Sequence, residues 1–130
     1  MKTKTIKQSV NIKASPKEVY DVIMDSKKHS KLTGSVAKMS SKVGGKFTAY
    51  DSYIDGKNVE LVSGKKIVQS WHASDWEKGH YSTVIFEFTK TKTGTKLTFT
   101  HKDVPIEHCE SISDGWKEYY WEPLKEMFAR

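Results

Sequence analysis

The sequence has a single cysteine, Cys109, and a single arginine, Arg130, beside 21 lysines. One cysteine excludes an internal disulfide and fits a reducing compartment. No apolar run approaches the ~20 residues needed to cross a bilayer, so no membrane span is expected. The first residues also lack the apolar segment of a secretory signal. We therefore expect a cytoplasmic protein.

The shortage of arginine also bears on the net charge of +6. Recognition of phosphates and base edges favours the bidentate guanidinium group, which lysine cannot replace. The lysines are spread along the whole chain instead of forming one run. This distribution is typical of a solvated surface, and we expect no nucleic-acid partner.

Aromatic residues are what the chain has in quantity: four tryptophans, six tyrosines and five phenylalanines. A chain of 130 residues has the usual length of one domain and can bury a core without a metal or a disulfide. No repeat, linker or low-complexity segment interrupts it. We expect one domain over residues 1–130.

The first part of the chain predicts a strand followed by two short helices. Residues 5–13 alternate between apolar and polar side chains, as in a half-buried strand. Ser15 and Glu18 form a capping box around Pro16, which suits the first position of a helix. A second helix is expected over residues 27–32. Asp25 or Ser26 would be its cap, and Gly34 would end it.

The middle of the chain has the turn spacing that is typical of successive β-hairpins. Turn signals recur at short spacing, at Val43-Gly44-Gly45, Asp55-Gly56, Ser63-Gly64 and Thr93-Gly94. Between them we predict six antiparallel strands, over about 35–40, 46–54, 58–62, 66–73, 81–90 and 95–102. With the first strand, the predicted sheet has seven strands.

The last sixteen residues, 115–130, are crowded with rings and predict a long amphipathic helix that starts near Ile112 or Ser113. One broad face carries Ile112, Trp116, Tyr119, Tyr120, Pro123, Leu124 and Met127. The opposite face carries four acids, Asp114, Glu118, Glu122 and Glu126. Pro123 cannot donate to the carbonyl of Tyr119, so the helix should kink there.

A helix this aromatic needs a large concave partner, and a curved sheet would supply one. The expected fold is therefore α+β, with the sheet wrapped around the C-terminal helix and a cavity between them.

Several segments together give the chain a family resemblance. They are 14–20 (ASPKEVY), 43–50 (VGGKFTAY), 54–58 (IDGKN), 67–71 (IVQSW), 79–83 (GHYST), 94–101 (GTKLTFTH), Gly115-Trp116 and Glu122-Pro123-Leu124. In this order they cover nearly the whole chain. The chain resembles the activator-of-heat-shock-protein-90-ATPase homologue domain of the START-like (SRPBCC) superfamily. The resemblance implies the helix-grip fold, a seven-stranded antiparallel sheet around a long C-terminal helix with two small helices in the gap.

The resemblance also implies two kinds of function. Eukaryotic members stimulate the ATPase of the chaperone and carry a separate N-terminal domain that docks on it. The wider superfamily binds lipids, hormones and polyketides in the cavity. Because residues 1–130 hold only the helix-grip domain, we expect ligand binding in preference to cochaperone activity.

The residues that would line the cavity follow from the alternation of the strands. On the inner face we place Phe47, Gln69, Trp71, Phe86, Phe88, Leu97, Phe99 and His101, with Trp116, Tyr120 and Leu124 from the helix. Tyr53 and Glu60 join this face unless a β-bulge turns them outward. Such a lining is mostly apolar with a few polar groups, which is the usual composition of a small-molecule pocket.

Two interpretations fit these side chains. The rings either fill the core or border a ligand cavity. Gln69 and His101 alternate in step with apolar neighbours, and burying either without a partner would cost about 1–3 kcal/mol. They therefore pair with each other or with the backbone, or they face a wet cavity. His101 is accordingly either a satisfied structural histidine or a ligand contact.

Motifs for chemistry are sparse. The histidines, His29, His72, His80, His101 and His108, do not show the local spacing of a zinc site, even with Cys109 beside the last. There is no nucleophile elbow, phosphate loop or dinucleotide fingerprint. We expect no metal and no cofactor.

The leading hypothesis is a binding module for a small hydrophobic or amphipathic ligand, as a monomer or weak dimer. The alternative is a chaperone-linked, stress-response interaction protein. An enzyme that works in the cavity has the least support.

Overall fold

The structure is a computed structural model that describes residues 2–129, and these residues form one antiparallel sheet of six strands. The order across the sheet is β1-β6-β5-β4-β3-β2, so the first and the last strands of the chain are neighbours. The strands are β1 (Thr3–Ile12), β2 (Lys46–Ala49), β3 (Ile54–Val62), β4 (Lys66–Ala73), β5 (Ser82–Thr91) and β6 (Gly94–Pro105).

The two short helices begin as the sequence predicts. α1 (Pro16–Met24) has Ser15 as its N-cap, and Ser15 and Glu18 form the predicted capping box. α2 (Ser26–Thr33) is capped by the Asp25 carboxylate, which accepts from the backbone N–H of Lys28. It ends at Gly34, whose φ of 77° lies in the left-handed region that glycine tolerates.

The terminal helix is longer and less regular than the sequence predicts. A 3₁₀ turn, η1 (Ile106–His108), leads into α3 (Cys109–Trp116), so the helix starts before the predicted Ile112 or Ser113. The pair His108-Cys109, which the sequence places in a polar loop, belongs to this helical start. A π-helical segment, η2 (Lys117–Trp121), follows, and α4 (Glu122–Met127) completes the helix.

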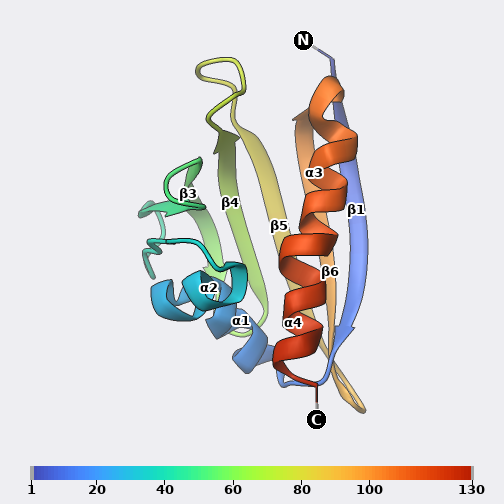
Figure 1. Cartoon of the computed structure of the whole chain (residues 1–130). Coiled ribbons are helices and arrows are strands. Elements are labelled where there is room, and N and C mark those ends of the chain that lie inside the picture. Colours follow the sequence, from blue (N-terminus) through green and yellow to red (C-terminus); the bar gives the residue numbers. More distant parts are fainter. Residues whose placement is uncertain (1, 130) are drawn as a thin grey trace.

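Figure 1 shows all of these helices on one face of the sheet, with the terminal helix running along β1 and β6 and the pair α1 and α2 beside it. The inward side chains of the strands and the helices bury one contiguous apolar core between the two layers. This arrangement confirms the predicted helix-grip fold, although its sheet has six strands instead of seven.

The strand predicted over 35–40 is wrong for a specific reason. Its only ladder contact is an isolated bridge between Lys38 and Thr48. The neighbouring backbone N–H groups donate instead to serine hydroxyls on α2. Ala37 donates to Ser30 and Met39 to Ser26, and the N–O distance is 2.8 Å in both bonds. Side-chain acceptors on a helix thus replace the ladder, and the segment becomes a strap along α2.

The prediction of one strand over 46–54 is also wrong. β2 ends at Ala49, and the chain turns through Tyr50, Asp51 and Ser52, whose φ angles are 51°, 54° and 74°. No glycine marks this turn. The turn predicted at Asp55-Gly56 lies inside β3 instead.

The π-helical segment explains which face of the terminal helix is buried. The backbone N–H of Glu122 donates to the carbonyl of Lys117, five residues back, immediately before Pro123. A π turn rotates each residue by less than an α turn does, so it shifts the positions of later side chains around the helix, although Leu124 stays buried. Trp121 is buried at 3% exposure, whereas Tyr119 and Met127 are 48% and 38% exposed. The four acids predicted on the solvent face are exposed.

Within residues 2–129, none of the helices combines the length and the apolar character that crossing a membrane requires.

Candidate functional site

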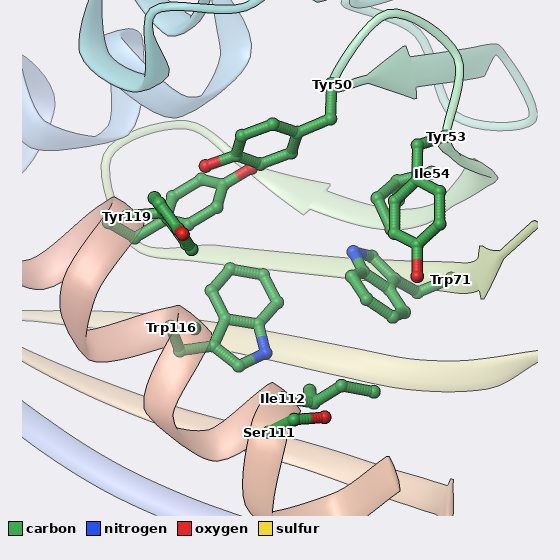
Figure 2. Close-up of a pocket in the computed structure, with 10 residues that line it drawn as sticks. Tyr50, Tyr53, Ile54, Trp71, Ser111, Ile112, Trp116 and Tyr119 are labelled. Atoms are coloured by element: carbon green, nitrogen blue, oxygen red, sulfur yellow. The ribbon is translucent and has the colours of Figure 1, made fainter. Parts of the chain in front are cut away.

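A pocket of about 500 Å³ lies between the terminal helix, the turn that follows β2, and β4. We call it the aromatic pocket, because six of its ten lining residues carry aromatic rings (Figure 2). Its lining consists of Tyr50, Tyr53, Ile54, Trp71, Ser111, Ile112, Gly115, Trp116, Tyr119 and Tyr120. None of these side chains is charged at neutral pH, so the pocket suits an apolar guest.

The left-handed turn presents two of the tyrosines. Tyr50 and two successors hold positive φ angles, a conformation that is costly for residues with a side chain. A hydrogen bond closes the turn: the backbone N–H of Tyr53 donates to the carbonyl oxygen of Tyr50, with an N–O distance of 3.0 Å. Asp51 fixes it to the strap, because its N–H donates to the carbonyl of Val36 and its carboxylate accepts from the Val36 N–H. The surrounding contacts thus hold a strained backbone at the pocket wall.

Tyr50 contributes an unusual hydroxyl group. Its oxygen is buried and, of the side-chain N and O atoms that the structure describes, it is the one buried atom without a hydrogen-bond partner. Its ring packs edge-on against Tyr119 and Tyr120, with centroids 5.9 and 6.3 Å apart. Burial, with the nearby Tyr119 and Glu118, raises the pKa of the Tyr50 hydroxyl. The group is therefore a neutral donor or acceptor beside the pocket.

Tyr53 forms the rim of the pocket. Its side chain is 43% exposed, and its hydroxyl donates to the Asp75 carboxylate over 2.6 Å. Burial and this hydrogen bond raise the pKa of Tyr53 to about 12. The bond ties the rim of the pocket to the loop between β4 and β5.

Tyr120 is held at the opposite wall by a buried histidine. The Nδ1–H of His29 donates to the carbonyl of Ile23 over 2.8 Å, which leaves Nε2 to accept from the Tyr120 hydroxyl over 2.7 Å. This arrangement fixes the neutral tautomer of His29. Burial lowers the pKa of His29 and raises that of Tyr120.

A second histidine supports the two tryptophans of the pocket. His101 contacts the rings of Trp71 and Trp116, with centroids 4.8 and 5.9 Å away. Both of its nitrogens are hydrogen-bonded, to Trp116 and to Ser82, and the side chain has no exposed surface. His101 is a satisfied histidine in the core, and it orients the indoles without bordering the pocket.

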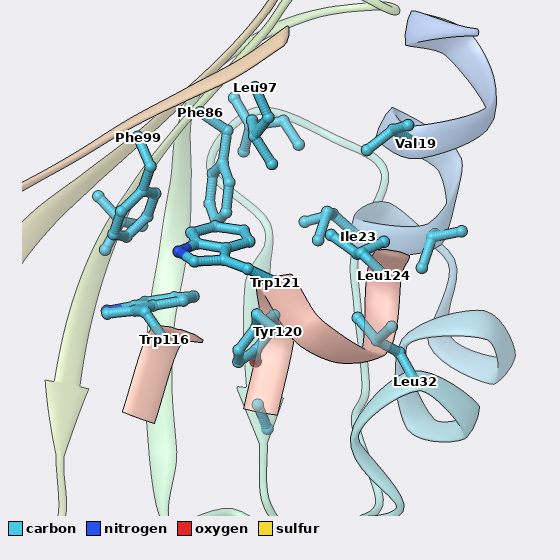
Figure 3. Packing of buried hydrophobic residues seen from close by; sticks show 14 of the residues in the cluster. Val19, Ile23, Leu32, Phe86, Leu97, Phe99, Trp116, Tyr120, Trp121 and Leu124 are labelled. Carbon is cyan, nitrogen blue, oxygen red and sulfur yellow. The ribbon is translucent and has the colours of Figure 1, made fainter. Parts of the chain in front are cut away.

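The sequence-predicted cavity residues fall into two groups. Tyr53, Trp71, Trp116 and Tyr120 line the aromatic pocket. Phe47, Gln69, Phe86, Phe99, His101 and Leu124 are buried in the core instead, as are Phe88 and Leu97. Figure 3 shows how Phe86 and Phe99 meet Trp116 and Trp121, and how Leu124 lies near Ile23. Glu60 is exposed, because a β-bulge between Asn58 and Glu60 turns it outward.

Gln69 has a structural partner, but that partner is not His101. Its Nε2 donates to the Asn58 side-chain oxygen over 2.9 Å. Asn58 in turn donates to the carbonyls of Ser40 and Lys42. The pair therefore secures the loop before β2 to the sheet.

Several lining residues are absent from the sequence-predicted set: Tyr50, Ile54, Ser111, Ile112, Gly115 and Tyr119. Ile112 and Tyr119 lie on the predicted apolar face of the terminal helix, and that face was the available signal. No sequence signal could have placed Tyr50 at the pocket, because a left-handed turn without glycine cannot be recognised from the sequence.

The structure offers no obvious metal centre within residues 2–129, where no group of three or more His, Cys, Asp or Glu side chains is placed to hold an ion.

Comparison with known proteins identifies the family of this chain. The profile of the family described as "Activator of Hsp90 ATPase homolog 1-like protein" matches residues 13–129. An activator of 90 kDa heat shock protein ATPase homolog from Dictyostelium discoideum is 34% identical over 98% of this chain and 33% of its own length. Homolog 1 from Homo sapiens is 31% identical over 88% of this chain and 34% of its own. The chain thus spans about a third of these relatives.

Solved structures agree with the fold. The crystal structure of an HSP90 activator from Plasmodium falciparum has a TM-score of 0.87 and 28% identity, and the match covers 96% of each chain. A protein from Mesorhizobium loti has a TM-score of 0.83 over 98% of each chain, and at 17% identity it supports the fold alone. With the profile match over most of its length, this chain belongs to the family of activator of Hsp90 ATPase homolog 1-like proteins.

Proposed function

We propose that this protein binds a small, largely apolar molecule in the aromatic pocket. The observation that carries the proposal is a space of about 500 Å³ with aromatic and aliphatic walls. Pockets for small molecules are commonly of this size and composition, with few polar groups among apolar ones.

The polar groups around the pocket support the same function. The buried Tyr50 hydroxyl lacks a partner among the described residues, and such a group costs free energy unless something bonds to it. The strained turn that carries Tyr50 is another feature typical of binding sites.

Native mass spectrometry of gently purified protein tests the proposal, followed by a titration with the uncharged fluorophore N-phenyl-1-naphthylamine. We expect co-purified mass or saturable fluorophore binding in the wild type. Ile112→Trp fills the pocket from α3 and should abolish binding. Asp114→Trp adds the same ring on the exposed face of α3 and should not. Equal binding by the two variants, or none by the wild type, would refute the proposal.

The family relationship favours a second candidate, interaction with a 90 kDa heat shock protein. Relatives with 31% and 34% identity are named as activators of its ATPase. The chain matches only about a third of the length of those proteins. Activation of the chaperone ATPase by this chain is therefore a proposal.

An ATPase assay with the chaperone of the same organism tests this candidate. Stimulation and co-elution on gel filtration are the expected results, and their joint absence would exclude it. The Ile112→Trp variant separates the two functions, since stimulation that survives a filled pocket must come from the outer surface.

A further inference from the structure

Gly115 occupies a position where the fold does not require glycine. It lies within the continuous helical stretch from Cys109 to Met127. Glycine is less stable than alanine in the interior of a helix, because the unfolded chain loses more conformational freedom there. A helix that keeps a glycine at such a position is expected to gain something from the missing side chain.

Neither backbone strain nor crowding accounts for this glycine. Gly115 is not among the glycines with positive φ. A Cβ atom built on it would meet only the Tyr119 ring within 4 Å, at an ordinary contact distance of 3.8 Å. By contrast, a Cβ atom on Gly56 would collide with the carbonyl oxygen of Ser70. The protein itself therefore has room for alanine at 115.

The space beside Gly115 is the aromatic pocket. Gly115 lines it. Figure 2 shows four other lining residues from the same helix, Ser111, Ile112, Trp116 and Tyr119. A methyl group at 115 would occupy part of the pocket while touching almost no protein. The helix backbone is bare at this point, and a guest can approach it closely.

The lining also indicates the class of the guest. Aromatic walls favour flat ring systems, which pack edge-on or offset against them. An ionised group would lose its hydration without gaining a counter-ion, because the pocket has no charged side chain.

We infer that Gly115 determines the specificity of the aromatic pocket by letting a flat, uncharged aromatic molecule lie against the helix backbone. This inference rests on the proposed ligand-binding function. It adds the class of the ligand and the residue that admits it.

The test compares N-phenyl-1-naphthylamine binding by the wild type, Gly115→Ala, Gly115→Leu and the exposed control Lys117→Ala. Gly115→Ala should weaken binding by about tenfold, as expected when one methyl group obstructs a fitted pocket. Its midpoint of thermal unfolding should rise by about 2–4 °C, because alanine favours the helix. Gly115→Leu should abolish binding, and Lys117→Ala should leave it unchanged. A purely structural role for Gly115 could not give weaker binding together with higher stability.

The outcomes distinguish a failure of ligand binding from a failure of the role of Gly115. Wild-type protein that carries no co-purified mass and binds no fluorophore refutes the proposed function itself. Co-purified mass without fluorophore binding overturns only the aromatic class of the ligand. Binding that Ile112→Trp blocks but Gly115→Ala leaves unchanged overturns only the role of Gly115. The sulfonated analogue 8-anilinonaphthalene-1-sulfonate has the same ring system, and it should bind at least about tenfold more weakly, since its charge would be buried unpaired. Equal affinity for the two probes would overturn the uncharged class.

Discussion

Trp116 donates a hydrogen bond from its indole Nε1–H to Nδ1 of His101 over 3.1 Å, and both side chains are almost fully buried. Because Nδ1 accepts, the neutral His101 carries its proton on Nε2 and donates to Ser82 over 2.7 Å. The Ser82 hydroxyl then donates to the carbonyl of Trp71 over 2.8 Å. One directed chain of hydrogen bonds thus joins the terminal helix to three strands and orients the Trp116 indole.

Trp116 should be among the most destabilising positions to truncate. Trp116→Ala removes a buried indole and should lower the free energy of unfolding by about 3–5 kcal/mol. Trp116→Phe keeps a ring but leaves His101 Nδ1 without its donor, which should cost about 1–3 kcal/mol. Urea denaturation measures both, with the half-exposed Tyr119→Ala as a control that should lose less. A loss near zero for Trp116→Ala would mean that the helix packs by another face.

Much of the fold could be predicted from local patterns. The capping box of Ser15 and Glu18, the cap at Asp25 and the strand over 66–73 follow from short-range chemistry that the structure retains. The strap near Ala37 could not be predicted, because its backbone partners are serines on a helix, 7 and 13 residues away along the chain. The spacing of turn signals predicted a strand there, and tertiary hydrogen bonds overrode it.

The pocket was harder to predict than the core. Period-two alternation correctly placed Phe86, Phe99 and their neighbours on the buried face. It could not separate residues that pack against each other from residues that border a space. Trp121 was assigned to no face, because a π turn shifts the helical phase and no residue spacing announces it. Pocket walls depend on such departures from regular structure.

Acid should destabilise the fold through two buried histidines. Burial lowers the pKa of His101 to about 3 and also lowers the pKa of His29, whereas both return to about 6.5 in the unfolded chain. Below 6.5 the unfolded state binds more protons, so the free energy of unfolding falls as the pH decreases. The slope should approach about 1.4 kcal/mol per pH unit from His101 alone, and His29 should add to it.

Urea titrations between about pH 7 and pH 5, where carboxylates stay ionised, measure this slope. His29→Gln is the matched variant. Its amide can donate to the Ile23 carbonyl and accept from Tyr120, which reproduces both bonds of the imidazole without a titrating group. We expect the slope to become smaller in this variant, because only the His101 contribution remains. Stability that does not change with pH in the wild type would contradict the buried neutral state.

Gln8 should fasten the terminal helix to β1. Its side-chain oxygen accepts from the Trp121 indole over 2.6 Å, and its Nε2 donates to the carbonyl and the hydroxyl of Ser113 at 3.0 and 2.9 Å. Gln8→Ala leaves a buried indole N–H without an acceptor and should cost about 1–3 kcal/mol in urea denaturation. The neighbouring Ser9→Ala, on the exposed face of the strand, should change stability by less than about 0.5 kcal/mol. Similar losses in the two variants would rule out this role for Gln8.

Gly56 should tolerate alanine poorly, in contrast to Gly115. Within β3 it faces β4, where a Cβ atom would collide with the Ser70 carbonyl oxygen and lie 2.7 Å from the Phe47 ring. The strands would have to separate, and we expect Gly56→Ala to lower the free energy of unfolding by about 1–3 kcal/mol. Denaturation of Gly56→Ala and Gly115→Ala side by side supplies the control, since the same chemical change should destabilise one variant and stabilise the other. If Gly56→Ala were as stable as the wild type, the close approach of β3 and β4 at this position would be wrong. The close approach of β3 and β4 also bears on the aromatic pocket, because two of its lining residues lie on these strands. Ile54 begins β3, and Trp71 follows Ser70 on β4.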